Sequence, residues 1–66
     1  MNDYKLTLRM LRAKFSYTQD EVAEKLNISP STWSKWERGL NFPDVLNIKK
    51  IEDLFNVSYA DIKFLQ

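Results

Sequence analysis

The sequence predicts an all-α fold, a compact domain of five short helices in which residues 1–66 form a single unit. Three observations support this prediction. The chain has one Gly and two Pro among 66 residues, and 44% of its residues are hydrophobic, which favours a small helical core over a turn-rich β protein or a disordered chain. Apolar residues recur at helical spacing, and residues suited to helix caps precede most of these segments.

The first helix is predicted from an apolar stripe, although its start carries no clear signal. The stripe has four-three-four spacing, which places its members on one helix face: Tyr4, Leu8, Leu11 and Phe15. A second helix is predicted to begin at Thr18, because Thr18 and Glu21 have the spacing of a capping box. It ends at Asn27, a residue that tolerates the left-handed conformation, and buries Val22, Ala23 and Leu26.

The third helix has two chemically different sides. Ser29 is a suitable cap, Pro30 suits the first helical position, and Gly39 closes the helix. At about 100° per residue, the side predicted to face inward carries Trp33, Trp36, Glu37 and Leu40. The other side carries Ser31, Ser34, Lys35 and Arg38, small polar and basic side chains suited to a flat, negatively charged partner.

Two further helices are predicted after the loop that contains Pro43. Asp44 caps the fourth helix, whose predicted buried stripe is Val45, Ile48, Ile51 and Phe55. Ser58 and Asp61 have a capping-box-like spacing, which predicts a short fifth helix with Ile62 inside.

Composition excludes several classes of function. The chain has no Cys and no His, which removes disulfides, thiolate or imidazole metal sites and the common nucleophilic dyads, so we expect neither an enzyme nor a cofactor or metal. No apolar run approaches the roughly 20 residues that span a bilayer, and we expect a cytoplasmic protein.

The net charge of +1 is too small to indicate a nucleic-acid partner by itself. Basic residues do cluster near the N-terminus: Lys5, Arg9, Arg12 and Lys14.

The stretch "TQDEVAEKLNISPSTWSKWERG" resembles the helix-turn-helix of the Xre type, the DNA-binding domain of lambdoid phage repressors and Cro proteins. The resemblance covers about residues 5–63 and is carried by an ordered set of short motifs at family spacing. These are Leu11-Arg12, Thr18-Gln19, Val22-Ala23, Leu26, Ile28-Ser29, Trp36-Glu37, Gly39, Pro43 and Val57-Ser58.

The resemblance implies a sequence-specific regulator of transcription, a repressor, that binds double-stranded DNA with its third helix in the major groove. It implies base contacts at Pro30, Ser31, Ser34 and Lys35. It implies phosphate contacts at Thr18, Gln19, Arg38 and Asn41, and an internal ion pair between Arg12 and Glu37. A homodimer on a two-fold operator is expected, with interface candidates Phe42, Tyr59, Phe64 and Leu65. The protein would be encoded by a bacterium or phage and act at the nucleoid.

Some residues depart from the family pattern. Trp33 stands where the family usually has a smaller aliphatic residue, and Leu40 and Phe42 occupy loop positions that are often polar or basic. We interpret Trp33 as a core residue that leaves an indole edge exposed, and Lys35 as either a DNA contact or a solvated lysine. The competing class is a protein-interaction module of the same fold, an antitoxin or adaptor. Such a module should expose apolar residues on the outer face of the third helix.

Overall fold

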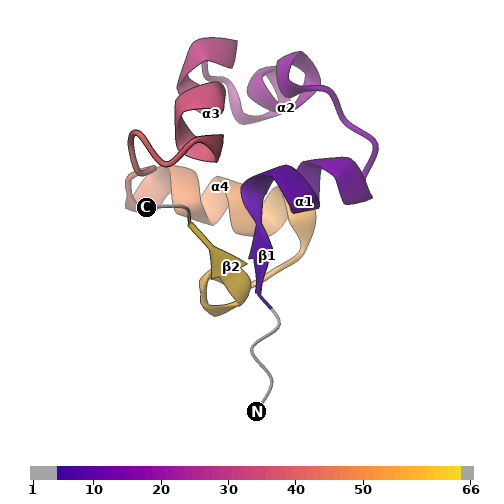
Figure 1. The fold of residues 1–66 in the computed structure, drawn as a ribbon, viewed down its shortest axis with the longest axis vertical. Helices are drawn as coiled ribbons and strands as arrows, with labels where there is room; N and C mark the ends of the chain where they lie inside the picture. The colour runs from indigo at the N-terminus through magenta and orange to yellow at the C-terminus, as the bar shows by residue number, and fades with distance from the viewer. Residues whose placement is uncertain (1–4, 65–66) are drawn as a thin grey trace.

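The computed structural model describes residues 5–64 and shows four α-helices and a two-stranded sheet in this part of the chain (Figure 1). Their bounds are β1 Leu6–Thr7, α1 Leu8–Lys14, α2 Gln19–Leu26, α3 Pro30–Glu37, α4 Val45–Phe55 and β2 Ile62–Lys63. A single 3-10 turn, η1, occupies Tyr59–Asp61 before β2. Tyr4 and Leu65, predicted in the first stripe and the dimer interface, lie outside the described residues.

Side-chain caps begin all four α-helices. Thr18 and Glu21 make both bonds of the predicted capping box, since the Thr18 hydroxyl accepts from the Glu21 amide and the Glu21 carboxylate accepts from the Thr18 amide. Ser29 caps α3 and Asp44 caps α4, as the sequence predicts. Thr7 caps α1 by accepting from the amide of Met10, a start signal that we did not identify from the sequence.

The core is built around the inner side of α3 and the end of α4. Trp33 is fully buried. The side chain of Trp36 packs beside it, and the centroids of the two rings are 6.0 Å apart. The ring of Phe55 lies 6.3 Å from the Trp33 ring and 5.3 Å from the Phe15 ring, so α4 joins α3 to the end of α1. The expectation of an exposed indole edge at Trp33 is therefore wrong, because the side chain has 0% exposure within the core cluster.

Three residues predicted to be buried are exposed. Phe15 is 39% exposed at the C-cap position of α1, whereas Leu8 and Leu11 on the same stripe are buried. Leu40 is 60% exposed because α3 ends at Glu37 and Gly39 takes a φ of 73°, so the helical wheel no longer applies beyond that point. Val45 is 83% exposed at the first position of α4, whereas Ile51 and Phe55 on the same stripe are buried.

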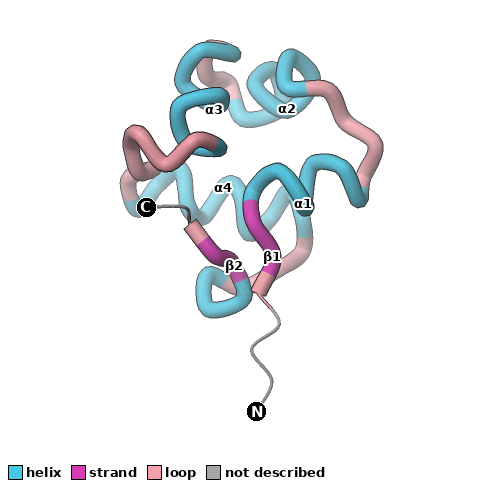
Figure 2. The backbone as a smooth tube through the Cα atoms, in the orientation of Figure 1, coloured by secondary structure: helices cyan, strands magenta, loops and turns pink. Residues whose placement is uncertain are grey.

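The predicted fifth helix is wrong, and so is the all-α description. Ser58 donates to the side chain of Asp61 instead of capping a backbone amide, and the chain makes only the 3-10 turn η1. It then extends into β2, which pairs in parallel with β1 (Figure 2). Leu6 stands opposite Ile62 and Thr7 opposite Lys63, so the sheet joins the two ends of the described chain.

The helix-turn-helix lies at the opposite end of the molecule from this sheet. In Figure 1, α2 and α3 stand together on one side of α4 and α1, and β1 and β2 lie on the other. Asn27, with a φ of 59°, and Ile28, whose amide bonds the Ala23 carbonyl, make the turn between α2 and α3. None of the helices in residues 5–64 is long and apolar enough to cross a bilayer.

Candidate nucleic-acid interface

The outer side of α3 presents small polar and basic side chains to solvent. Pro30, Ser31 and Lys35 are exposed and Ser34 is half-buried. The orientation of this face toward solvent is fixed by the opposite side of α3, because the two indoles of the same helix are buried in the core. The start of the helix is also fixed, since Ser29 accepts from the amide of Thr32. The four predicted base contacts therefore form one face on a rigidly seated helix.

Arg38 and Asn41, the predicted second phosphate clamp, lie at the end of α3 and in the loop beyond it. Both are exposed. The Arg38 Nε donates to the Ser34 carbonyl at 3.4 Å, so part of this guanidinium completes the C-terminal turn of the helix. Its remaining N–H groups are available to an anion. The chain turns at Gly39, and the Leu40 amide bonds the Lys35 carbonyl at 2.9 Å, which holds the loop against the helix end.

Thr18 and Gln19, the predicted first phosphate contacts, lie at the start of α2. The capping box uses the amide of Thr18, whereas the amides of Gln19 and Asp20 belong to the first turn, where a helix has no carbonyl partner to offer. The Gln19 side chain turns inward and donates from Nε2 to Glu37 Oε1 at 2.9 Å. One of the two amide hydrogens of Gln19 is thus used inside the protein, and the other is free.

Glu37 is a buried acceptor shared by three helices. Its side chain is 2% exposed, and Oε2 accepts from Arg12 Nε and from Trp33 Nε1, both at 2.6 Å. Oε1 accepts from Gln19 and, at 3.3 Å, from Arg12 Nη2. The predicted partners Arg12 and Glu37 are therefore in direct contact, and the bonds from Gln19 and Trp33 are additions that the sequence did not suggest.

These bonds control the ionisation of Glu37. Burial alone would raise the pKa of the Glu37 carboxyl, but the hydrogen bonds that it accepts and the charge of Arg12 outweigh burial and hold that pKa below 4.5, its ordinary value. The carboxylate is charged at neutral pH, and it fixes the position of α3 relative to α1 and α2.

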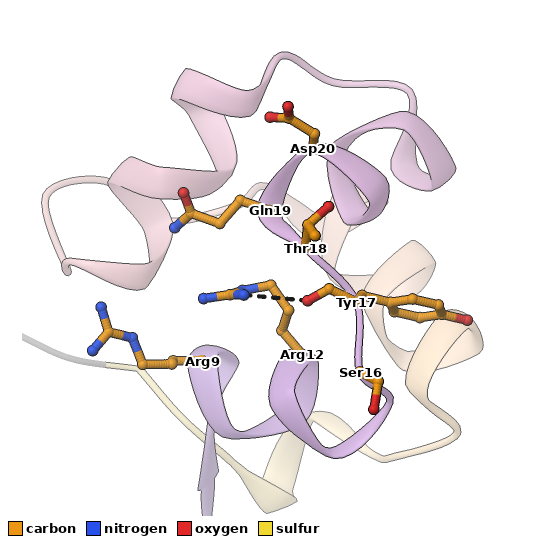
Figure 3. Close-up of a pocket in the computed structure, with 7 residues that line it drawn as sticks. All are labelled: Arg9, Arg12, Ser16, Tyr17, Thr18, Gln19 and Asp20. Carbon is orange, nitrogen blue, oxygen red and sulfur yellow. Dashed lines mark hydrogen bonds between the residues drawn. The ribbon is translucent and has the colours of Figure 1, made fainter.

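A cleft of about 690 Å³ lies between one face of α1, the loop that follows α1, and the start of α2. Figure 3 shows the head groups of Arg9, Arg12 and Gln19 directed toward the same side of this cleft. Arg9 was noted in the sequence only as part of a basic cluster. Its position three residues before Arg12 puts both on one helix face, a signal that could have assigned it to this site.

Three predicted candidates for a dimer interface, Phe42, Tyr59 and Phe64, lie in the described part of the chain. Together with Val45 they form what we call the apolar patch. The Phe64 ring lies 5.6 Å from the Phe42 ring and 5.8 Å from the Tyr59 ring. Val45 and Tyr59, together with Ile48, line a hollow of about 300 Å³. Val45 joins this patch only because the structure exposes it, which the helical wheel did not predict.

Residues 5–64 contain no group of three or more acidic, His or Cys side chains placed to hold a metal ion. What the described surface offers is a polar and basic α3 face, flanked by the start of α2 on one side and the loop after α3 on the other.

Comparison with known proteins agrees with this architecture. A family model described as helix-turn-helix matches residues 8–62, and the chain belongs to that family, which confirms the resemblance drawn from the sequence. The chain is 45% identical over 51 residues to the HTH-type transcriptional regulator ImmR of Bacillus subtilis (strain 168), covering 77% of this chain and 40% of that protein. It is 34% identical over 55 residues to the HTH-type transcriptional activator BcrR of Enterococcus faecalis, covering 83% of this chain and 27% of that protein.

The chain therefore spans less than half the length of either relative. No solved structure matches it.

Proposed function

We propose that this protein is a transcriptional regulator that binds double-stranded DNA sequence-specifically, with α3 in the major groove. The observation that carries the proposal is the outer face of α3. Its exposed side chains are small, polar or basic, and its opposite side is locked into the core by two indoles. A helix seated in this way can enter a groove without rearranging. An antitoxin or adaptor that used α3 would be expected to expose apolar side chains there, and this helix does not.

The proposed base contacts are Pro30, Ser31, Ser34 and Lys35. A lysine at this position donates to the O6 and N7 acceptors of guanine, whereas proline and the serine Cβ offer surface to a thymine methyl group. Serines carry less base-reading information than Arg, Asn or Gln, so sequence-dependent DNA shape contributes to specificity.

Phosphate contacts are proposed on both sides of α3. Thr18 and Gln19 supply one side, where the first-turn amides of α2 and the helix dipole favour an anion. Arg38 and Asn41 supply the other side from the loop after α3. These contacts fix the orientation of the helix in the groove and carry no sequence information themselves.

The salt dependence of binding tests the phosphate contacts. Affinity for a duplex should fall steeply with added salt, and Arg38→Ala should flatten the log–log slope by about one unit because one phosphate contact is lost. Fluorescence anisotropy with a labelled duplex measures both slopes. Lys14→Ala, which removes a charge at the far end of α1, is the control and should leave the slope close to that of the parent. If Arg38→Ala and Lys14→Ala matched the parent at every salt concentration, Arg38 would be excluded as a contact.

The protein is further proposed to bind a two-fold operator as a homodimer through the apolar patch. A single recognition helix reads only a few base pairs, whereas dimers of this class place two helices one DNA turn apart. The patch exposes aromatic and aliphatic side chains around a hollow, as a self-complementary contact requires. So small an interface gives weak association in solution, and the operator itself holds the protomers together.

Sedimentation on a two-fold duplex tests the dimer. The parent should bind two protomers cooperatively, and Phe42→Ser and Val45→Ser should convert this to independent binding of single protomers. Leu46→Ser is a matched control, because Leu46 is exposed beside Val45 but does not line the hollow. Independent binding by the parent itself would contradict the dimer.

Regulation by repression is also proposed, since a dimer bound to DNA blocks polymerase without further contacts. Increased transcription of a reporter gene on addition of the protein would contradict repression.

A further inference from the structure

We propose that Arg9 binds a DNA backbone phosphate in the cleft between α1 and α2, whereas Arg12 has a structural role. This proposal rests on the proposed function, since it adds a contact to the same DNA interface. It assigns different roles to two arginines that lie one helical turn apart and carry the same charge.

Arg12 uses three of its five N–H groups inside the protein. Its Nε and Nη2 donate to the two oxygens of Glu37, and its Nη1 donates to the carbonyl of Tyr17 at 3.2 Å (Figure 3). Its side chain is 20% exposed. A guanidinium held by three nitrogen atoms in this way joins α1 to α3 and to the loop before α2, and it has little left to offer a ligand.

Arg9, in contrast to Arg12, has an exposed side chain with few contacts inside the protein. Its side chain is 74% exposed, and within residues 5–64 its contact with an acid is the 3.9 Å approach of Nε to Glu37 Oε1. That oxygen already accepts hydrogen bonds from Gln19 and Arg12 at shorter distances. The contact involves Nε, and within residues 5–64 the Nη groups of Arg9 make no hydrogen bond or ion pair.

The charge balance of the cleft favours an anion beside Arg9. Arg12 and Glu37 neutralise one another, so that among the residues lining the cleft the remaining charges are those of Arg9 and Asp20. Asp20 also lines the cleft, but its carboxylate lies well apart from the Arg9 guanidinium in Figure 3. The Gln19 amide group is directed toward the same side of the cleft in Figure 3, so α1 and α2 each place a donor group on that side.

The anion is identified as a phosphodiester of the duplex that α3 reads, because the cleft adjoins α3 directly. Gln19 and Arg9 both approach Glu37, the last residue of α3. A phosphate in this position would be contacted by α1 and by the start of α2 while α3 occupies the neighbouring groove.

Salt titration of Arg9→Gln, Arg9→Lys and Lys14→Gln against the parent, on one labelled duplex, tests the proposal. Lys14→Gln removes the same charge from the other end of α1, outside the cleft. Arg9→Gln should flatten the log–log slope by about 0.9, so that its loss of affinity between 50 and 200 mM salt is about threefold smaller than that of the parent. Arg9→Lys should keep the slope of the parent, because a lysine still neutralises one phosphate. Lys14→Gln should keep it as well.

Two results would overturn the proposal while leaving DNA binding intact. One is a slope for Arg9→Gln equal to that of the parent. The other is saturable binding of inorganic phosphate alone at the Arg9 Nε–H resonance together with an unchanged duplex slope, which would make the cleft a free-anion site. A parent that does not bind duplex DNA would overturn the proposed function as well. The thermal unfolding temperature of Arg9→Gln should match that of the parent, since the Arg9 side chain is exposed. This measurement checks that the salt slopes are compared between folded proteins.

Discussion

Replacing Glu37 by Gln tests whether the buried Glu37 carboxylate, through its bonds to Arg12, Gln19 and Trp33, anchors α3 to the rest of the protein. The substitution keeps the size of the side chain but removes the charge that pairs with Arg12, and it turns an amide group toward donors that need an acceptor. Leaving one member of a buried ion pair without its partner costs about 3–5 kcal/mol. A 66-residue domain has a total stability of about 3–10 kcal/mol. Glu37→Gln should therefore bring the protein close to the limit of folding at room temperature.

Urea unfolding followed by tryptophan fluorescence measures this loss, because both indoles are buried in the folded protein and become exposed on unfolding. Glu24→Gln is the matched control, since Glu24 is exposed on α2 and should change the free energy of unfolding by less than about 0.5 kcal/mol. Equal unfolding midpoints for Glu37→Gln and Glu24→Gln would refute the assignment of Glu37 as the anchor of α3.

The same site makes stability depend on pH. The pKa of Glu37 is lower in the folded protein than its ordinary value of 4.5. As the pH falls, the Glu37 carboxylate is therefore protonated at a higher pH in the unfolded chain than in the folded protein. The stabilisation is therefore complete above pH 4.5 and is lost as the pH falls through the folded pKa. The parent should lose stability over this acid range, and Glu37→Gln should lose less because its contribution is already absent. An identical acid dependence in both proteins would contradict the ionised, hydrogen-bonded state of Glu37.

Two further predictions concern the two sides of α3. Trp36→Ala should destabilise the protein by about 3–5 kcal/mol by leaving a cavity, and a melting temperature equal to that of the parent would place this indole outside the core. Lys35→Ala should leave folding unchanged and cost about 1–3 kcal/mol at one base pair, a G·C pair, in competition binding with single-base variants of the site. Unchanged base preferences would reduce Lys35 to a surface charge.

The sequence predicted those parts of the fold that depend on local interactions. Thr18, Ser29 and Asp44 each cap a helix through a bond to an amide three residues away, so a pattern within four residues contains the whole interaction. Helical periodicity likewise identified both indoles of α3 as inward-facing. The same method failed at Phe15, Leu40 and Val45, which lie where a helix has just ended or just begun.

The parts that could not be predicted depend on residues far apart in the chain. The pairing of Leu6 with Ile62 joins two short segments near opposite ends, and neither is long enough to show the alternation of a strand. The different environments of Arg9 and Arg12 depend on Glu37, which lies on another helix. Family resemblance supplied the Arg12–Glu37 pair, but no sequence pattern indicated that Gln19 and Trp33 also donate to that carboxylate.

Selection of bound sequences from a random pool of duplex DNA tests the central claim, that α3 reads DNA as one half of a dimer. The account predicts enrichment of a two-fold sequence whose half-sites are centred about 34–36 Å apart, one turn of DNA. The same selection with Lys35→Ala should change the preferred base at one position in each half-site. A pool that shows no enriched sequence after repeated selection with the folded parent protein would contradict the claim.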